Sequence, residues 1–399
     1  MLTVQEAFAC VMNTAVDFGI EEVSITQAHG RILRETIYAD RPFPPFDRVT
    51  MDGIALNFQD YENGRTDFEI QGLQAAGFQQ QKLQHNGCIE IMTGAILPDN
   101  TDTVVPYEDI FRNQNTFSII KGIQKGQNIH QQGSDVKKGE ALLYPGIKIT
   151  GAEIAVLATV GKTNIRVSRQ PKIALVATGD ELIAINEEPK LHQLRISNVY
   201  AFQSVLNEIG VEAYIHHIKD DKETLHKEFS NLFAQYDLII CSGGVSAGKF
   251  DYIPEVLKEL NVATRFHKVK QRPGKPLLFA VSDKNVPFFG LPGNPVSGFM
   301  CLHRYVLPWL YQSLQMNPVP VQMQAVLTKD VKFDKPLTYF IPVNVQVTSQ
   351  GSLHANPHLT NGSGDFAILT SANAFMELDE KKDEFKAGEI YPVWFYKSL

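Results

Sequence analysis

Apolar and polar positions alternate differently in different parts of the chain, and each pattern predicts a different kind of structure. Near the N-terminus, Thr3 and Glu6 form a capping box followed by apolar residues at helical spacing, so the first forty residues are expected to be largely helical. From about residue 52 to residue 129 the apolar runs are short and separated by turn residues, which is typical of a small β-rich domain. Strands are expected there at 89–92, 103–105 and 117–120.

From Pro171 onward, continuous apolar runs alternate with amphipathic segments, which predicts a parallel, doubly wound sheet covered by helices. The expected strands are 172–177, 211–218, 238–241, 276–280 and 286–289. The expected helices are 198–209, with Ser197 as its cap, 222–233, 254–260 and 295–314. Beyond residue 320, short alternating runs without a long helix indicate a small β-barrel or sandwich.

Proline-rich segments at 41–46 and 317–320 are expected to be linkers that divide the chain. The predicted fold class is therefore α/β plus β, in several domains. A doubly wound α/β domain is expected at 169–316 and a C-terminal β-barrel domain at 317–399. A β domain at 45–129 is expected to be inserted into an elongated helical and linker domain made of 1–44 and 130–168.

Composition narrows the class of protein. The 399 residues are 44% apolar and carry a formal net charge of -7, which suits a globular protein and argues against broad binding to nucleic acid or to an anionic membrane. No apolar run of about 18 residues predicts a membrane-spanning helix, and no secretory signal is recognisable. The four cysteines are far apart in the sequence, which indicates reduced, mostly buried thiols in a cytoplasmic protein.

Three glycine-rich turns follow predicted strands, at Thr178–Glu181, Ser242–Ser246 and Gly290–Ser297. Glycine lets a backbone approach a ligand closely, and consecutive N–H groups can bind an anion. In a doubly wound sheet, ligands bind beyond the carboxyl ends of the strands. The three turns therefore predict a ligand crevice at that edge of the sheet.

Charged residues near these turns indicate the kind of ligand. Carboxylates recur at loop positions, namely Asp52, Glu181, Asp220, Asp221 and Asp251. Mg²⁺ is bound by one or two carboxylates together with substrate oxygens. The basic segment Lys268–Lys275 surrounds a glycine and can present cations to phosphate or another oxyanion. The combination predicts a site for a phosphorylated or oxyanionic ligand, assisted by a divalent metal.

Taken in order, these motifs resemble the molybdopterin molybdenumtransferase family, which includes the bacterial MoeA type and is related to the E domain of gephyrin. The matching segments extend over essentially the whole chain: Pro45–Asp47, Met51–Gly53, Ile91–Ala95, Gly133–Asp135, Thr178–Leu182, Asp220–Asp221, Ser242–Ser246, Pro273–Pro276 and Gly290–Pro295. The resemblance implies that the α/β domain binds molybdopterin. It also implies a homodimer whose site is shared between the subunits.

The activity implied by the resemblance belongs to molybdenum cofactor biosynthesis. Such an enzyme inserts molybdate into adenylylated molybdopterin and releases AMP with the help of Mg²⁺. The molybdopterin adenylyltransferase would be a further partner. Two other functions remain open, namely a molybdopterin- or nucleotide-binding module without turnover and a scaffold, and tungstate could replace molybdate as substrate. The inserted β domain with Met51–Gly53 favours the transferase.

Carried over residue by residue, the resemblance implies particular roles. The catalytic groups would be Asp52, Thr93, Glu181, Asp221 and Asp251, with Asp221 and Asp251 as metal ligands and Asp220 as the alternative to Asp221. The substrate would be held by Thr178, Gly243, Gly244, Val245, Ser246, Pro292, Gly293, Asn294 and Pro295, while Arg272, Lys275 and Ser297 would face molybdate or phosphate. Structural interpretations also exist, because Asp52 suits a turn and Glu181 a helix cap.

The chain departs from the family pattern around the expected oxyanion pocket. Arg272 stands where many members carry lysine, and the two cations differ in donor geometry. The segment Leu337–Pro342 lacks the arginines that members often carry there. Either Arg272 compensates for these missing cations, or the affinity for molybdate differs.

Overall fold

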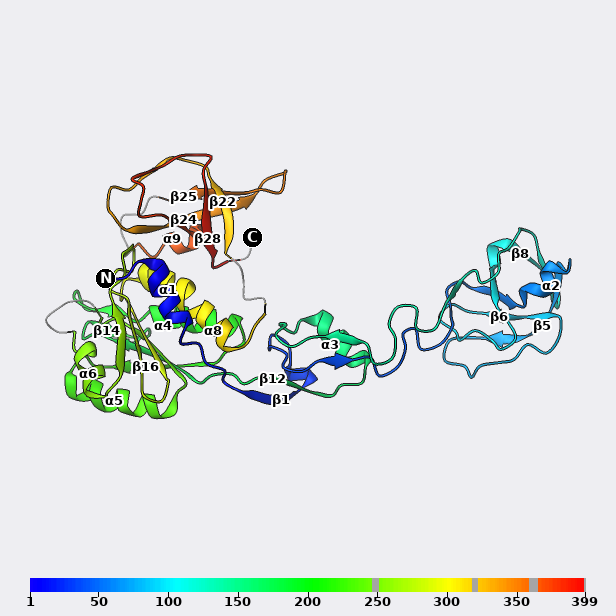
Figure 1. Cartoon of the computed structure of the whole chain (residues 1–399), viewed down its shortest axis with the longest axis horizontal. Coiled ribbons are helices and arrows are strands. Elements are labelled where there is room, and N and C mark those ends of the chain that lie inside the picture. The colour runs from blue at the N-terminus through cyan, green and yellow to red at the C-terminus, as the bar shows by residue number, and fades with distance from the viewer. Residues whose placement is uncertain (246–250, 318–321, 359–364, 398–399) are drawn as a thin grey trace. The chain divides into compact units, whose positions relative to one another are not determined.

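The computed structural model describes residues 1–245, 251–317, 322–358 and 365–397, and the chain folds into two compact units (Figure 1). The first unit consists of Met1–Glu35, Pro145–Gly151 and Asn164–Leu399. The second consists of Thr36–Tyr144 and Ala152–Thr163. In the sequence, the second unit is thus inserted into the first.

The N-terminal segment of the first unit begins as predicted and then departs from the prediction. Helix α1 (Val4–Met12) starts with the capping box, in which Thr3 Oγ1 accepts a hydrogen bond from the Glu6 N–H. The expectation that the first forty residues are helical is wrong beyond Met12. Strand β1 (Ile20–Ser24) follows and pairs antiparallel with β12 (Asn164–Ser168). This pairing with a distant segment outweighs the local helical pattern.

The second unit is built around a six-stranded sheet in the order β7-β4-β6-β5-β9-β8. Its strands are β4 (Gly53–Leu56), β5 (Asp67–Gln74), β6 (Gly87–Ile91), β7 (Thr103–Pro106), β8 (Ile110–Asn113) and β9 (Thr116–Ile119). The three strands expected from the short apolar runs are confirmed as β6, β7 and β9. Phe68, Cys88 and Phe117 are buried in the core of this sheet.

Short elements complete this part of the chain. Two small antiparallel pairs are β2 (Ile37–Tyr38) with β11 (Ala141–Leu143) and β3 (Arg48–Val49) with β10 (Ile129–His130). The helices are α2 (Phe58–Glu62) and α3 (Gly151–Thr159). There are also two 3₁₀ turns, Tyr107–Asp109 in the second unit and Ile25–Gln27 in the first.

The α/β sheet of the first unit has the order β16-β13-β17-β21-β20-β18. Strands β13 (Ile173–Thr178), β16 (Ala213–Ile218), β17 (Leu238–Ser242) and β21 (Pro287–Leu291) are parallel. Strand β20 (Leu278–Val281) runs antiparallel to both of its neighbours, β21 and β18 (Ala263–His267), so the expectation of a wholly parallel sheet is corrected. The link at 282–286 is too short for a crossover and forms a hairpin, in which Ser282 Oγ accepts from the Val286 N–H.

Helices cover both faces of this sheet, as the doubly wound prediction requires. They are α4 (Asn198–Glu208), α5 (Lys222–Gln235), α6 (Ile253–Glu259), α7 (Pro295–Cys301) and α8 (Leu307–Ser313), with a π-helical segment at Leu302–Val306 joining the last two. Alternate residues of β13 enter different cores: Leu175 packs with residues of α4, α7 and α8, and Val176 packs with residues of α5 and α6. The predicted α/β fold class is confirmed.

The C-terminal region forms a closed β-barrel. Its sheet has the order β19-β24-β25-β22-β28-β26, and a further pairing of β24 with β26 closes the ring. The strands are β22 (Met323–Leu327), β24 (Thr338–Val347), β25 (Leu353–Pro357), β26 (Ala374–Leu378) and β28 (Ile390–Phe395). Also present are β19 (Gln271–Arg272), the pair β23 (Val331–Lys332) and β27 (Glu384–Phe385), and the short helix α9 (Ile368–Ser371).

A buried ion pair connects this barrel to the α/β region within the first unit. Arg304, in the π-helical segment, donates to Glu377 on β26 at 3.0 Å, and the two side chains are only 6% and 8% exposed. Trp394 Nε1 donates to the same carboxylate at 2.8 Å. The Arg304 guanidinium also lies over the rings of Phe8 and Trp394, at 4.4 and 4.3 Å from their centroids. The charges are thus removed from water and enclosed by aromatic rings.

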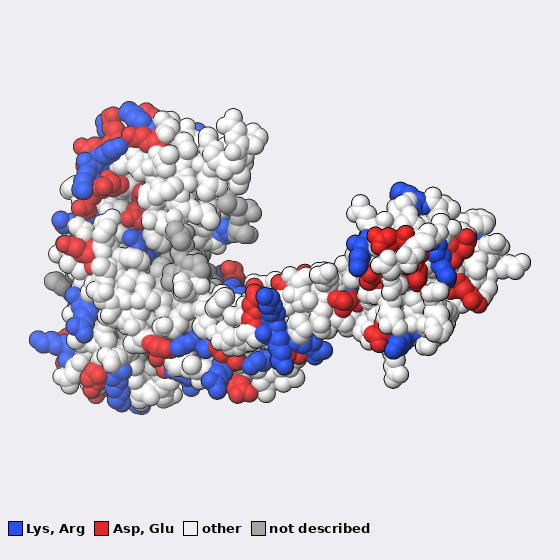
Figure 2. Space-filling model, turned by 45° about the vertical axis from the view of Figure 1, so that its right-hand side comes forward, with Lys and Arg blue, Asp and Glu red and all other residues white. Residues whose placement is uncertain are grey.

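The surface carries charges of both signs. Lys and Arg side chains are interspersed with Asp and Glu side chains over the face drawn in Figure 2. Among the described residues, no helix is both long and apolar enough to cross a membrane. The four cysteines are free thiols, and Cys88, Cys241 and Cys301 are buried, as expected.

Candidate active site

A large cleft lies where the turns after β13, β17 and β21 meet, at the carboxyl edge of the α/β sheet. Its volume is about 860 Å³, within the range of roughly 300–1,000 Å³ that is usual for small-molecule sites. The candidate residues that line it are Thr178, Glu181, Asp220, Gly243, Gly244, Val245, Asp251, Pro292, Gly293, Asn294 and Pro295. The three glycine-rich turns therefore surround one cleft. Ser246 lies outside the described residues.

The turns after β17 and β21 meet through their backbones. Gly243 has a φ of +98°, and a Cβ atom there would lie 2.5 Å from the carbonyl oxygen of Thr178. A Cβ on Gly244 would lie 2.6 Å from Ile253 Cδ1, and one on Gly293 would lie 3.6 Å from Gly243 Cα. Side chains have no room at Gly243 and Gly244, so this part of the cleft wall presents peptide groups.

Asn198 joins the two turns and was not recognised from the sequence. Its Nδ2 donates to Ser242 Oγ and to the carbonyl oxygen of Gly293, both at 2.8 Å. Asn198 is the first residue of α4, while Ser197, the expected cap, makes no capping hydrogen bond through its side chain. The available signal was a polar residue in the first turn of a helix that begins at the carboxyl edge of the sheet.

An acidic group forms another part of the cleft, at the end of β16. Burial raises the pKa of the Asp220 carboxyl, and the nearby carboxylates of Asp180, Asp251 and Glu181 raise it further, while the Thr178 hydroxyl opposes the shift. Asp220 Oδ1 and Thr178 Oγ1 are both buried, and neither has a hydrogen bond of acceptable geometry to the described residues. The cleft thus holds a costly, unsatisfied oxygen among like charges.

The adjacent aspartate serves a different purpose. Asp221 is the N-cap of α5, where its Oδ1 accepts from the Thr224 N–H at 2.9 Å. This hydrogen bond holds the pKa of Asp221 below its usual value. Asp221 is not among the lining residues, so of the two alternatives only Asp220 reaches the cleft.

The carboxylates of the cleft fit a divalent cation that is bound partly by substrate. Among the described residues, no group of three or more histidine, cysteine, aspartate or glutamate side chains is arranged to hold a metal by itself. Asp220 and Asp251 both line the cleft. The unsatisfied oxygen of Asp220 and the raised pKa of its carboxyl fit Mg²⁺, which takes one or two carboxylates and completes its shell with other oxygens.

The three residues expected to face the oxyanion are close in the sequence to residues that line the cleft, but they do not line it themselves. Arg272 is exposed on β19, opposite Tyr339 of β24, with its guanidinium 5.9 Å from the centroid of Phe333. Lys275 is exposed in the following turn, and its neighbour Pro276 does line the cleft. Ser297 is only 2% exposed in the first turn of α7.

Asp52 and Thr93 belong to the second unit, where they form a pair. Both the backbone N–H and the hydroxyl of Thr93 donate to Asp52 Oδ1, at 2.6 and 2.9 Å. These hydrogen bonds, the backbone one first, hold the pKa of Asp52 below its usual value. Asp52 is therefore an exposed, ionised carboxylate in a fixed orientation.

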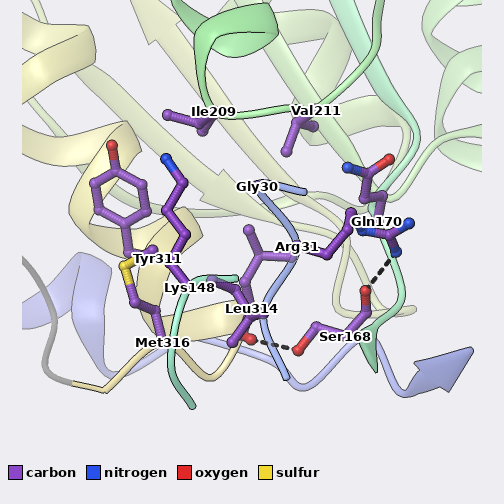
Figure 3. Close-up of a pocket in the computed structure, with 11 residues that line it drawn as sticks. Gly30, Arg31, Lys148, Ser168, Gln170, Ile209, Val211, Tyr311, Leu314 and Met316 are labelled. Atoms are coloured by element: carbon purple, nitrogen blue, oxygen red, sulfur yellow. Dashed lines mark hydrogen bonds between the residues drawn. The ribbon is translucent and has the colours of Figure 1, made fainter. Parts of the chain in front are cut away.

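A second cavity in the first unit is too small for such a ligand (Figure 3). It measures about 20 Å³, which is room for about one water molecule. Arg31 donates to the Ser168 carbonyl oxygen at 2.8 Å, and the Ser168 hydroxyl donates to the carbonyl of Leu314 (Figure 3). Because these polar groups already have protein partners, we interpret the cavity as a small packing defect and not as a ligand site.

Comparison with known proteins gives the same picture over the full chain. Residues 2–161 match the MoeA N-terminal region (domain I and II), 174–312 a probable molybdopterin binding domain, and 324–396 the MoeA C-terminal region (domain IV). The chain is 39% identical to the molybdopterin molybdenumtransferase of a Synechocystis strain, over 99% of this chain and 100% of that protein. It is 32% identical to that of Staphylococcus epidermidis, over 98% and 95%.

Structural comparison agrees with the sequence comparison. The crystal structure of the molybdopterin biosynthesis moea protein from Pyrococcus horikosii superposes with a TM-score of 0.85 at 30% identity, covering 100% of both chains. The match therefore spans the inserted unit, the α/β region and the barrel. These matches, together with the cleft, establish that the chain belongs to the MoeA family of molybdopterin molybdenumtransferases.

Proposed function

We propose that this chain inserts molybdate into adenylylated molybdopterin and releases AMP in a Mg²⁺-dependent reaction. The observation that carries the proposal is the composition of the cleft, which combines a glycine backbone wall with the Asp220 carboxylate, whose buried Oδ1 has no hydrogen-bond partner among the described residues. The family membership and the curated relatives named molybdopterin molybdenumtransferase support the same reaction.

The glycine wall and the acidic side of the cleft suit two requirements of the reaction, namely binding phosphate and binding Mg²⁺. The peptide N–H groups of Gly244 and Gly293 would bind phosphate oxygens, since closely approaching N–H groups stabilise anions. The Gly243 N–H donates to the Leu291 carbonyl oxygen at 3.1 Å and so shapes the wall instead. Asp220 and Asp251 would hold Mg²⁺, which when bound neutralises negative charge on the phosphates as the adenylyl group leaves. Asn198 would keep the two glycine turns in register while substrate enters. Asp220 takes the metal-binding role expected of Asp221, because Asp221 is engaged as a helix cap.

The direct test of this function is an assay of AMP release. Purified protein is incubated with adenylylated molybdopterin, Mg²⁺ and molybdate, and AMP is measured over time. We expect AMP release only when all three are present. Binding of the adenylylated substrate without any AMP release would instead identify a binding module, and turnover with tungstate but not molybdate would change the substrate.

Lys275 is expected to serve the oxyanion. Molybdate is a compact dianion whose desolvation must be offset by fixed cations. Lys275→Ala should therefore raise the molybdate concentration needed for half-maximal AMP release by at least about 10-fold, with binding of adenylylated molybdopterin unchanged. Lys284→Ala, which removes another exposed lysine from the hairpin at 282–286 at the opposite end of β20, is the matched control and should behave as wild type. An unchanged molybdate dependence in Lys275→Ala would exclude Lys275 from the oxyanion pocket.

We further propose a homodimer in which Asp52 of one subunit completes the cleft of the other. Its support is the family resemblance and the orientation of Asp52, which is exposed and held by Thr93. Asp52→Ala and Asp251→Ala should each be inactive as homodimers. When subunits mix at random, half the dimers are mixed and each has one intact site of two, so about a quarter of wild-type activity should return. Verified mixing without recovery would mean that each site is built from one chain.

The molybdopterin adenylyltransferase remains a proposed partner that would deliver the adenylylated substrate.

A further inference from the structure

A buried amide lies directly beneath the turn that carries Arg272 and Lys275. The Gln271 side chain is fully buried, although it precedes an arginine in a strongly basic segment. Its Nε2 donates to the carbonyl oxygen of Gly274 at 2.9 Å and contacts Cys301 Sγ at 3.5 Å. This amide therefore connects both ends of the turn to the helix that begins at Pro295.

The other end of the same amide is held by a buried phenol. The Tyr305 hydroxyl donates to Gln271 Oε1 at 2.5 Å, and Tyr305 is fully buried in the π-helical segment Leu302–Val306. Burial raises the pKa of Tyr305 well above its usual value, so its hydroxyl stays a donor. π-helical segments are often found at functional sites because they redirect side chains that a regular helix would point elsewhere.

The turn itself is closely packed on this pair. Gly274 has a φ of +86°, and a Cβ there would lie 2.8 Å from Cys301 Sγ and 2.9 Å from Gln271 Nε2. The Val269 N–H donates to the Lys275 carbonyl oxygen at 3.0 Å, which closes the turn at its base. An apolar side chain could fill the space of Gln271, but it would leave the Gly274 carbonyl without this partner.

We infer that Gln271 and Tyr305 are positioning residues that fix the backbone of the turn 272–275 and thereby set the affinity for the oxyanion. The inference rests on the proposed function, in which Lys275 faces molybdate. A cation on a fixed turn binds an anion more tightly than the same cation on a mobile turn, because less ordering is needed on binding. Neither residue needs to touch the substrate to have this effect.

The test uses two substitutions that keep shape and remove hydrogen bonds, Gln271→Met and Tyr305→Phe. Each should raise the molybdate concentration for half-maximal AMP release by about 5-fold, the scale of one lost hydrogen bond, with kcat and binding of adenylylated molybdopterin within about 2-fold of wild type. The double variant should be little worse than either single one, since both act through one interaction.

A structural readout separates this inference from the proposed function. In Gln271→Met, exchange of the Val269 amide hydrogen should be at least about 10-fold faster, because the turn that it closes is less constrained. The control is Ser313→Ala, which removes another buried side-chain hydrogen bond, the one accepted from the Val16 N–H, and should leave both readouts unchanged.

Three outcomes decide the matter. Faster exchange together with a raised molybdate requirement supports the inference. Wild-type exchange and wild-type molybdate dependence in Gln271→Met, with a clear defect in Lys275→Ala, overturn it while the proposed function stands. Faster exchange without any molybdate effect in Gln271→Met or Tyr305→Phe would overturn the functional part, and a wild-type molybdate dependence in Lys275→Ala as well would show that the oxyanion binds elsewhere.

Discussion

Asp220→Asn is expected to lower the rate of AMP release by at least about 100-fold, the usual scale for losing a group that stabilises charge in the transition state. Asparagine keeps the shape of the side chain but cannot carry the negative charge that a divalent cation requires. Added Mg²⁺ should raise the melting temperature of the wild-type protein and leave that of Asp220→Asn nearly unchanged, because only the first would bind the ion in the cleft.

The same substitution should stabilise the ligand-free protein. The pKa of Asp220 is raised above its ordinary value of 3.8, so at neutral pH its ionised form costs folding free energy. That cost is fully present above the raised pKa, declines as the pH falls through it, and is absent below about 3.8, where the unfolded chain is protonated as well. The melting temperature of Asp220→Asn should therefore exceed that of wild type at pH 7, and the difference should vanish as the pH approaches this value.

Asp221→Ala is the matched control, because it changes the neighbouring aspartate. It removes the cap from α5 and should lower the melting temperature modestly while leaving AMP release close to wild type. Asp220→Asn is thus expected to raise the melting temperature and lower the activity, whereas Asp221→Ala should lower the melting temperature and leave the activity nearly unchanged. A folded, inactive Asp221→Ala beside an active Asp220→Asn would reverse the assignment and restore Asp221 as the functional carboxylate.

Arg304→Met should be among the most destabilising single substitutions in the chain. It would leave the Glu377 carboxylate buried without its cation, and removing one partner of a buried pair costs about 3–5 kcal/mol of unfolding free energy. Urea unfolding followed by tryptophan fluorescence should report the loss, because Trp394 donates to the same carboxylate.

The control for this prediction removes both charges. Arg304→Met combined with Glu377→Gln should recover much of the lost stability, since a neutral amide is far cheaper to bury than an unpaired carboxylate. Equal destabilisation in the single and double variants would mean that packing of Arg304 against Phe8 and Trp394, rather than charge, accounts for the effect.

The sequence predicted those elements whose pattern is set by their own burial. The continuous apolar run at 238–241 predicted a buried strand, and these residues lie in β17, in which every residue is buried. The capping box at Thr3 and Glu6 was equally local and is present. The segment Ile20–Ser24 was missed because its strand depends on β12, more than a hundred residues away in the sequence.

The parts of the candidate site that depend on glycine backbone geometry were predicted from the sequence. The parts that depend on the orientation of a side chain were predicted less well. The turn containing Gly243 and Gly244 was recognisable, because a larger residue would clash at both positions. Choosing between Asp220 and Asp221 required the exact end of β16, and a shift of one residue changes the role. Gln271 gave no signal, since a polar residue between two cations reads as surface until its burial is seen.

The contact between the two glycine turns affects the thermodynamics of binding. Glycine loops lose much conformational entropy when they become ordered, and a loop that orders only around its ligand weakens the affinity by that amount. Here Gly243 packs on the Thr178 carbonyl and beside Gly293, and Asn198 bridges the two turns. The entropy is therefore lost when the protein folds, before any ligand arrives. The described part of this wall is preorganised, and calorimetry should show little ordering penalty when a phosphate group binds there.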